Sequence, residues 1–170
     1  MSGYDVEIET LPLCGFLNLQ GGNEVRQLSG EYLGIELPTT ANTLATAGAN
    51  RVVYCINPDH WLLQAPDGSQ LEILESLEQC NTQYSHSFVD VSDMYARIRL
   101  SGAEAREVLS QGVAIDIHPR VFGPGSTARI GFAKTTVQLC CIDTLPTYII
   151  IVFTSYRQHV LDWLHQAAAK

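Results

Sequence analysis

The sequence predicts an α+β fold in which two copies of one unit follow each other along the chain. The first reason is an internal repeat, since Leu19 and Gly21 recur as Leu100 and Gly102, 81 positions later. Further pairs at this spacing are Leu28/Leu109, Ser29/Ser110 and Pro38/Pro119. Self-similarity at a fixed spacing indicates a repeated structural unit.

A second block of the repeat supports the same interpretation. Ile73 and Leu77 recur as Val160 and Leu164, 87 positions later. The extra positions fit an insertion within the second copy. The second reason for the predicted fold class is that helix and strand patterns occur in the same order in both copies.

The first copy begins with an expected strand over residues 14–19 and an expected helix over residues 23–33. The strand is a short apolar run that ends at two glycines. In the helix, Val25, Leu28 and Tyr32 lie three and four positions apart, which places them on one side.

The first copy continues with a loop, a hairpin and a helix. Residues 38–50 form a polar loop, and β-branched residues predict a strand over residues 51–56. A proline-containing turn at residues 57–59 leads into a second strand over residues 61–65. The helix that follows has an apolar stripe, formed by Ile73, Leu74 and Leu77.

In the second copy, strands are expected over residues 87–92 and 95–100. The latter alternates, with apolar side chains on one face and Arg97 and Arg99 on the other. A helix then runs to Gly112, since glycine commonly ends helices. Its apolar face is formed by Ala105, Val108 and Leu109.

The second copy ends with further strands and a helix. Residues 127–142 are long enough for two strands or one bent strand, and the apolar residues 147–153 predict a central strand. The last helix buries Val160, Leu161, Trp163 and Leu164. Serine followed three positions later by Glu or Gln predicts side-chain caps. These pairs are Ser69/Glu72, Ser101/Glu104 and Ser155/Gln158.

Each copy therefore has the order strand–helix–strand–strand–helix, as in ferredoxin-like units. One helical layer covers one face of each sheet, so the two copies are expected to pack together and share a core. We expect residues 1–170 to form a single domain of two packed repeats, which span about 11–80 and 86–168.

Composition limits the partners that the chain is expected to have. Its net charge is −8 and its only lysines are Lys134 and Lys170, so neither nucleic acid nor a membrane surface is an expected partner. Residues 1–13 lack a signal-peptide core, and the apolar residues 148–153 are too few to span a bilayer. We therefore expect a cytoplasmic protein. With 46% hydrophobic and 16% charged residues, part of its apolar surface is expected to be covered by a partner.

No established catalytic motif occurs in the chain. A nucleophile–base motif, a phosphate-binding loop and a dinucleotide-binding glycine pattern are all missing, so we assign no catalytic or cofactor-binding residue. The histidines are scattered and the cysteines lack Cys-x-x-Cys spacing, so no metal site is expected. Cys140 and Cys141 are interpreted as buried strand thiols.

Asp90, Ser92 and Asp93 form the cluster that most resembles a chemical site. Two carboxylates could exchange protons or hold a cofactor amine. The alternative is that Asp90 and Ser92 bond to nearby backbone groups where the strand ends. Arg97 and Arg99 could clamp a carboxylate of a ligand or partner protein, or could belong to a solvated strand face. These five residues are the candidates for a ligand site or an interface.

Several segments resemble the sarcosine oxidase gamma subunit family, and together they span nearly the whole chain. They are residues 14–21, 37–43, 58–63, 89–93, 98–102, 105–109 and 116–119, followed by Phe122, Pro124 and Gly125. The resemblance implies a fold similar to the folate-binding domain of glycine-cleavage aminomethyltransferases. It also implies a cytoplasmic heterotetrameric flavoenzyme with alpha, beta and delta subunits that oxidatively demethylates sarcosine to glycine.

Within such a complex, the resemblance implies that FAD, FMN, NAD and tetrahydrofolate belong to the other subunits. The gamma subunit would bind no cofactor itself and would serve as a structural, assembly subunit. An alternative is a folate-binding one-carbon (aminomethyl) transfer protein that uses Asp90 or Asp93 near a cavity between the two copies. A stand-alone regulatory ligand sensor is a third possibility.

Overall fold

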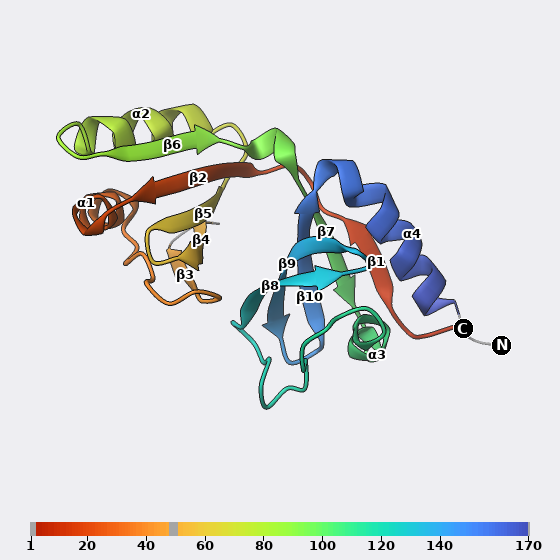
Figure 1. Ribbon diagram of the computed structural model, residues 1–170. Helices are drawn as coiled ribbons and strands as arrows, with labels where there is room; N and C mark the ends of the chain where they lie inside the picture. The colour runs from red at the N-terminus through yellow and green to blue at the C-terminus, as the bar shows by residue number, and fades with distance from the viewer. Residues whose placement is uncertain (1–2, 48–50, 170) are drawn as a thin grey trace. The chain divides into compact units, whose positions relative to one another are not determined.

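The computed structural model describes residues 3–47 and 51–169. These residues form two compact units, each built on one five-stranded antiparallel sheet (Figure 1). The first unit comprises Leu13–Ser92, and the second comprises residues 3–12 and 93–169. The predicted α+β fold class is confirmed.

The first unit contains five strands and two helices. In chain order they are β2 (Gly15–Gly21), α1 (Asn23–Leu33), β3 (Leu44–Ala47), β4 (Arg51–Asn57), β5 (His60–Ala65), α2 (Gln70–Cys80) and β6 (His86–Asp90). The strand order in the sheet is β3-β4-β5-β2-β6. Both helices therefore connect strands of the same sheet.

The second unit takes its first strand from the N-terminal segment. Its strands and α-helices are β1 (Glu7–Thr10), β7 (Tyr95–Ser101), α3 (Ala105–Ser110), β8 (Thr127–Phe132), β9 (Thr135–Asp143), β10 (Thr147–Phe153) and α4 (Arg157–Ala168). Short 3₁₀ turns, Ser92–Met94 and Thr154–Tyr156, precede β7 and α4. The strand order is β1-β7-β10-β9-β8, so the apolar strand β10 is central, as predicted.

The two sheets have corresponding strand orders. Strands β3, β4, β5 and β2 of the first sheet correspond to β8, β9, β10 and β7 of the second. The place beside β2 that β6 occupies is taken beside β7 by β1. The repeated positions fall on corresponding elements, since Leu19 and Leu100 lie in β2 and β7, and Leu77 and Leu164 lie in α2 and α4. All four side chains are buried.

Two of the predicted elements require correction, and one strand was missed. The strand expected to open the second copy is β6, which instead pairs with β2 in the first sheet, with Phe88 opposite Leu19. The expected loop over residues 38–50 contains the edge strand β3, and residues 48–50 lie outside the described residues. Strand β1, which pairs with β7 at the edge of the second sheet, was not predicted. Its acidic side chains give the sequence little apolar strand pattern.

The buried face of α1 differs from the predicted stripe. Its buried residues are Val25, Ser29, Gly30 and Leu33. Leu28 and Tyr32 are only partly buried. The reason is a close backbone approach, because a Cβ atom on Gly30 would lie 2.7 Å from the Ile35 carbonyl oxygen. Only a glycine fits at this position of the helix without a shift of the backbone.

The predicted side-chain caps do not form at α2, α3 or α4. Ser69 donates its hydroxyl backward to the Pro66 carbonyl at 2.7 Å. Glu104 instead accepts a hydrogen bond from the Asp5 amide at 2.6 Å. Gln158 donates one turn along its own helix. Each of these three side chains therefore forms a different hydrogen bond in place of the predicted cap.

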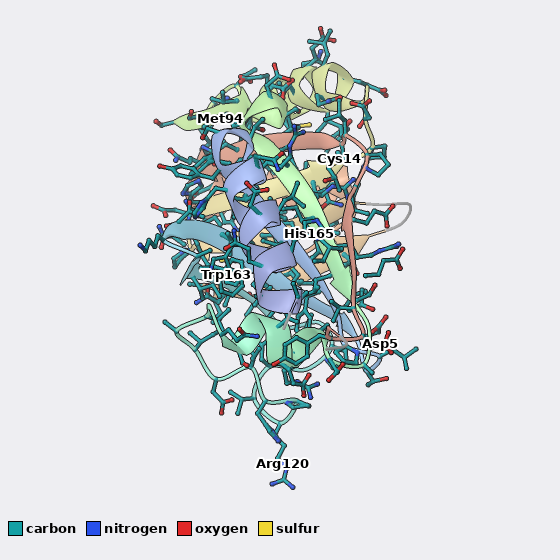
Figure 2. The ribbon with its side chains drawn as sticks, turned by 90° about the vertical axis from the view of Figure 1, so that its right-hand side faces the viewer. Asp5, Cys14, Met94, Arg120, Trp163 and His165 are labelled. Atoms are coloured by element: carbon teal, nitrogen blue, oxygen red, sulfur yellow. The ribbon has the colours of Figure 1, made fainter. Side chains whose placement is uncertain are left out.

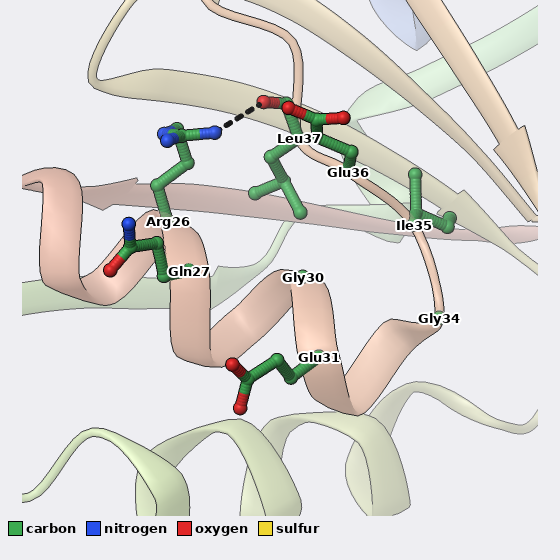
Figure 3. A pocket seen from close by; sticks show the side chains of 8 residues that line it. All are labelled: Arg26, Gln27, Gly30, Glu31, Gly34, Ile35, Glu36 and Leu37. Carbon is green, nitrogen blue, oxygen red and sulfur yellow. Dashed lines mark hydrogen bonds between the residues drawn. The ribbon is translucent and has the colours of Figure 1, made fainter.

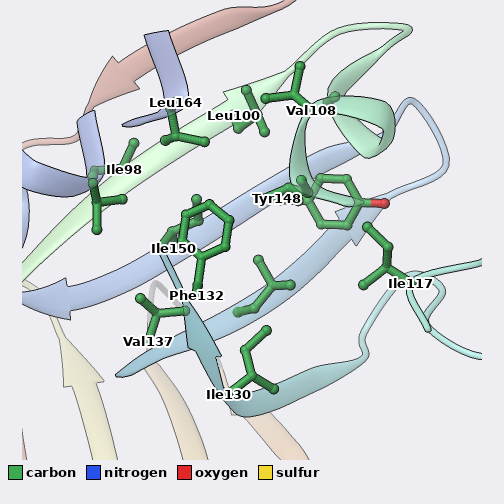
Figure 4. Close-up of a cluster of buried hydrophobic side chains, with 14 of the residues drawn as sticks. Ile98, Leu100, Val108, Ile117, Ile130, Phe132, Val137, Tyr148, Ile150 and Leu164 are labelled. Carbon is green, nitrogen blue, oxygen red and sulfur yellow. The ribbon is translucent and has the colours of Figure 1, made fainter. Parts of the chain in front are cut away.

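The apolar core of the second unit lies between its sheet and its helices. Figure 4 shows Phe132, Tyr148 and Ile150 on the sheet, with Val108 of α3 and Leu164 of α4 directed toward them. All of these side chains are at most 1% exposed. Burial of such a side chain contributes about 1.5–3 kcal/mol relative to exposure.

The first unit has a separate cluster of buried apolar side chains. It joins the strands β2, β4 and β5 to the buried faces of α1 and α2. Its largest fully buried members include Trp61, Leu17, Leu19, Leu63, Ile73 and Leu77. The Trp61 indole nitrogen donates a hydrogen bond to the Pro38 carbonyl at 2.7 Å, so its polar group is also satisfied.

Candidate functional site

Asp90 and Ser92 form a local hydrogen-bonded turn at the end of β6. One Asp90 carboxylate oxygen accepts hydrogen bonds from the Ser92 amide at 2.9 Å and the Ser92 hydroxyl at 2.5 Å. The same hydroxyl oxygen accepts from the Phe16 amide at 3.0 Å and from the Gln70 side chain at 3.3 Å. The pair therefore joins the start of β2 and the end of β6 to the start of α2. This is the backbone-bonding alternative considered above.

Asp93 is exposed and begins the longer of the two segments that make up the second unit. Its backbone carbonyl accepts a hydrogen bond from the Thr154 hydroxyl at 3.0 Å. Among the described residues, its carboxylate has no hydrogen-bond partner. Asp90 and Asp93 thus have different surroundings, with Asp90 engaged by Ser92 and Asp93 open to solvent.

Arg97 and Arg99 lie on the same face of β7, as predicted, and each has a partner within the second unit. Arg97 donates to the Pro12 carbonyl at 2.8 Å. Arg99 forms an ion pair with Glu9, which lies opposite it in the register of β1 and β7. Both side chains of the ion pair are more than one third exposed, so it contributes little to stability, about 0–1 kcal/mol. The carboxylate that pairs with Arg99 therefore belongs to Glu9 of the same chain.

A hollow of about 410 Å³ lies next to Arg99, and we call it the Arg99 hollow. Its lining residues include Leu11, Arg99, Ser101, Ile142, Asp143 and Ile149. Ile142 is 51% exposed, and Leu145 in the adjacent turn is 78% exposed. This combination of exposed apolar side chains with a polar rim is typical of protein interaction surfaces.

A second hollow, of about 560 Å³, lies along α1, and we call it the Arg26 groove (Figure 3). It is lined by Arg26, Gln27, Gly30 and Glu31 of α1 and by residues 34–37. The sequence patterns did not single out this region. The groove exists because Gly34 adopts a left-handed conformation, with a φ angle of 66°, and turns the chain back along the helix.

The buried cysteines are poorly suited to nucleophilic chemistry. Cys140 and Cys141 are both buried in β9, as interpreted from the sequence. Burial raises the pKa of the Cys141 thiol, and it also raises the pKa of the Cys55 thiol in β4. A raised pKa disfavours the thiolate, which is the reactive form.

One histidine has a defined charged partner. His86 Nε2 lies 2.7 Å from a Glu78 carboxylate oxygen, and its Nδ1 lies 2.7 Å from the Tyr84 carbonyl oxygen. The bond to Glu78 is the main cause of the raised pKa of His86. Within residues 3–47 and 51–169, no three His, Cys, Asp or Glu side chains form a group that could hold a metal ion.

The loop between α3 and β8 carries further exposed residues, with Arg120 at its tip (Figure 2). Ile117 and Phe122 anchor this loop by burial, while Val121 is 66% exposed. Among the helices of the described chain, none has the length and apolar character that crossing a bilayer requires.

Comparison with known proteins identifies related sequences. Residues 20–170 match the sequence profile of the sarcosine oxidase gamma subunit family. A sarcosine oxidase subunit gamma from Corynebacterium sp. (strain P-1) is 28% identical over 142 residues, which cover 82% of this chain and 68% of that protein. The corresponding subunit from Arthrobacter sp. is 30% identical over 139 residues, which cover 79% of this chain and 65% of that protein. The chain thus spans about two thirds of the length of these relatives.

Solved structures show the same fold. The heterotetrameric sarcosine oxidase from Corynebacterium sp. U-96 contains a chain that matches with a TM-score of 0.88 at 24% identity, over 96% of this chain and 83% of that one. The glycine cleavage system aminomethyltransferase T from Bartonella henselae matches with a TM-score of 0.68 at 11% identity, over 96% of this chain and 46% of that one. The expected similarity to aminomethyltransferases is therefore confirmed at the level of the fold.

Proposed function

The chain belongs to the sarcosine oxidase gamma subunit family, and on this premise we propose that it is the gamma subunit of a heterotetrameric sarcosine oxidase. The single observation that carries the proposal is the family match over residues 20–170. The fold agrees with it, because nearly the whole chain superimposes on a chain of a solved sarcosine oxidase. In this proposal the complex oxidatively demethylates sarcosine to glycine in the cytoplasm.

The proposed role of this chain is assembly of the complex. Its candidate polar residues support that role, because most of them are engaged within their own unit. Asp90 is bonded to Ser92, and Arg99 is paired with Glu9. In the proposal, the alpha, beta and delta subunits carry FAD, FMN, NAD and tetrahydrofolate, and the gamma chain supplies contact surface to them.

The Arg99 hollow is the surface that we assign to this contact. Ile142 and Leu145 are exposed apolar side chains at one end of the sheet, where a partner chain would remove them from water. Removing apolar surface from water contributes about 25 cal/mol per Å². The Arg99 guanidinium at the edge of the hollow supplies polar donors for the rim of the contact.

Co-purification with the other subunits tests the assembly role and the contact surface together. We expect wild-type chain, expressed with the other three subunits, to be recovered with them in equal amounts. Ile142→Asp and Leu145→Asp each place a carboxylate in the contact and are expected to lower that recovery at least about tenfold. Leu71→Asp is the matched control, because Leu71 is 67% exposed on α2, in the other unit. Unchanged recovery of both Ile142→Asp and Leu145→Asp would overturn the assignment of this surface.

The isolated chain provides a second test. We expect the purified chain to be colourless and to have no sarcosine oxidase activity. A yellow, flavin-loaded isolated chain would contradict the assembly role. Micromolar binding of tetrahydrofolate that is lost in Asp90→Ala would instead favour the folate-binding one-carbon transfer protein.

A further inference from the structure

Three hollows in the described part of the first unit share one side chain, Arg26 in α1. The first is the Arg26 groove. The second, of about 430 Å³, extends from Arg26 toward Ala45 and Thr46 of β3. The third, of about 390 Å³, extends from Arg26 toward Gly21 and Asp59. A single guanidinium therefore borders all three of these hollows.

The Arg26 guanidinium is held in place by neutral acceptors. Its Nε and Nη2 atoms donate to the Asn23 side-chain oxygen at 3.3 and 3.1 Å, and Nη1 donates to the Leu37 carbonyl at 3.4 Å. Within the described residues it forms no ion pair. A guanidinium has five N–H groups, so one hydrogen remains available on each terminal nitrogen. The positive charge is thus fixed in position but not neutralised by a carboxylate.

Two carboxylates lie in the same groove and are also unpaired. Glu31 projects from α1, and Glu36 projects from the segment that follows the helix. Figure 3 shows the Glu36 carboxylate beside the Leu37 carbonyl, on the side away from Arg26, and it shows the Glu31 side chain directed away from Arg26 on the other side of α1. Both glutamate side chains are exposed, and neither has a hydrogen-bond partner among the described residues. The groove therefore presents separated positive and negative charges.

The charge of the first unit limits the ligand that would enter the groove. Between residues 13 and 92 there are nine acidic residues and two basic ones, a net charge of −7. A simple anion would be repelled by this field, and by Glu31 and Glu36 in particular. A simple cation would leave Arg26 unneutralised. A zwitterion has no net charge and can satisfy both signs at once.

We propose that the Arg26 groove binds a small α-amino acid. The carboxylate of the ligand accepts hydrogen bonds from the free N–H groups of Arg26, and two parallel N–H···O bonds are the arrangement that guanidinium–carboxylate pairs favour. Its ammonium group donates to the Glu36 carboxylate. The buried side chains of Ile35 and Leu37 form the floor. The groove volume, about 560 Å³, lies in the range of about 300–1,000 Å³ that small-molecule sites occupy.

The proposal concerns this chain alone and does not depend on its assembly into a complex. It is tested by titrating the purified, isotopically labelled full chain with glycine and following backbone amide signals by NMR. We expect saturable shifts at residues 26–37, with a dissociation constant in about the millimolar range. Acetate and methylammonium each carry one of the two charges, and both are expected to bind more weakly than glycine.

Two variants separate the roles of the charges. Arg26→Gln is expected to weaken glycine binding by about 10- to 100-fold, because a charged hydrogen-bond pair is lost. Glu36→Gln is expected to weaken glycine binding while leaving acetate binding as it was or stronger. Glu75→Gln, on the exposed side of α2, changes the net charge equally and is expected to leave glycine binding unchanged. Amide spectra of each variant without ligand verify that the fold is retained.

Several results would overturn the proposal. One is the absence of saturable shifts at residues 26–37 in the wild-type chain. Another is equal glycine affinity in folded Arg26→Gln and wild-type chains. A third is equal affinity for glycine and acetate, because the site would then recognise only a carboxylate.

Discussion

Leu77→Ala tests whether the apolar stripe of α2 holds the first unit together. Leu77 is fully buried and belongs to the cluster that packs α2 on the sheet. The substitution removes three carbon atoms, worth about 0.8 kcal/mol each in transfer free energy, or about 2.4 kcal/mol in total. A residual cavity adds a further penalty, so the free energy of unfolding is expected to fall by about 3–4 kcal/mol.

The assay is urea denaturation followed by tryptophan fluorescence. Trp61 lies in the same cluster as Leu77 and reports on the packing of the first unit. Leu71→Ala provides the matched control, because Leu71 lies on the same helix but is 67% exposed. Its expected effect is below about 0.5 kcal/mol. If the two variants had equal stability, the assignment of the buried face of α2 would be refuted.

Three further predictions concern the backbone, a titratable pair and the thiols. Gly102→Ala is expected to lower the free energy of unfolding by about 2 kcal/mol or more, since the φ angle of Gly102 is 124° and an added Cβ would lie 2.4 Å from a backbone oxygen. Gly131→Ala is expected to be tolerated, because an added Cβ there meets no atom within 4 Å. Equal melting temperatures of the two variants would contradict this prediction. Because the pKa of His86 is raised in the folded chain, its pairing with Glu78 stabilises the fold fully below the ordinary pKa of 6.5, and this stabilisation is lost as the pH rises through the folded-state pKa. NMR titration of Glu78→Gln is expected to show a lower His86 pKa, and an unchanged pKa would exclude the pairing. Exposed Cys80 is expected to react with a thiol reagent in the folded chain, whereas the buried thiols of Cys55, Cys140 and Cys141 react only on unfolding. Rapid reaction of these buried thiols in the native state would contradict the observed burial.

The sequence repeat predicted much of the fold because it reflects buried positions. Leu77 and Leu164 are the same residue type in corresponding helices, and both have no exposed surface. The apolar run over residues 147–153 likewise indicated a central strand, because a strand with neighbours on both sides carries few polar residues. Burial leaves a periodic signal that a single sequence is able to reveal.

The edge strands were not predicted, because their stability depends on a neighbour. Strand β3 has the sequence Leu-Ala-Thr-Ala and extends the sheet through pairing with β4 alone. Strand β1 alternates glutamate with apolar and polar residues, and it is ordered by pairing with β7. Local propensity is weak in both segments, so tertiary pairing decides their conformation. The assignment of β6 to the second copy failed for the same reason, since its strand character was predicted but its partner was not.

The candidate site was predicted only in part. The shared face of Arg97 and Arg99 followed from the two-residue period of a strand. Their partners did not, because Glu9 and Pro12 lie far away in the sequence and are brought close by the pairing of β1 with β7. The Arg26 groove left no sequence signal, because it arises from the left-handed turn at Gly34.

Affinity purification of the tagged chain from its native cell tests the central claim most directly. The eluate is analysed by mass spectrometry for its subunits, by absorbance for flavin and by assay for sarcosine oxidation. We expect two large flavin-containing subunits in equal amount with the tagged chain, together with sarcosine oxidase activity. Recovery of a colourless chain without other subunits would contradict it.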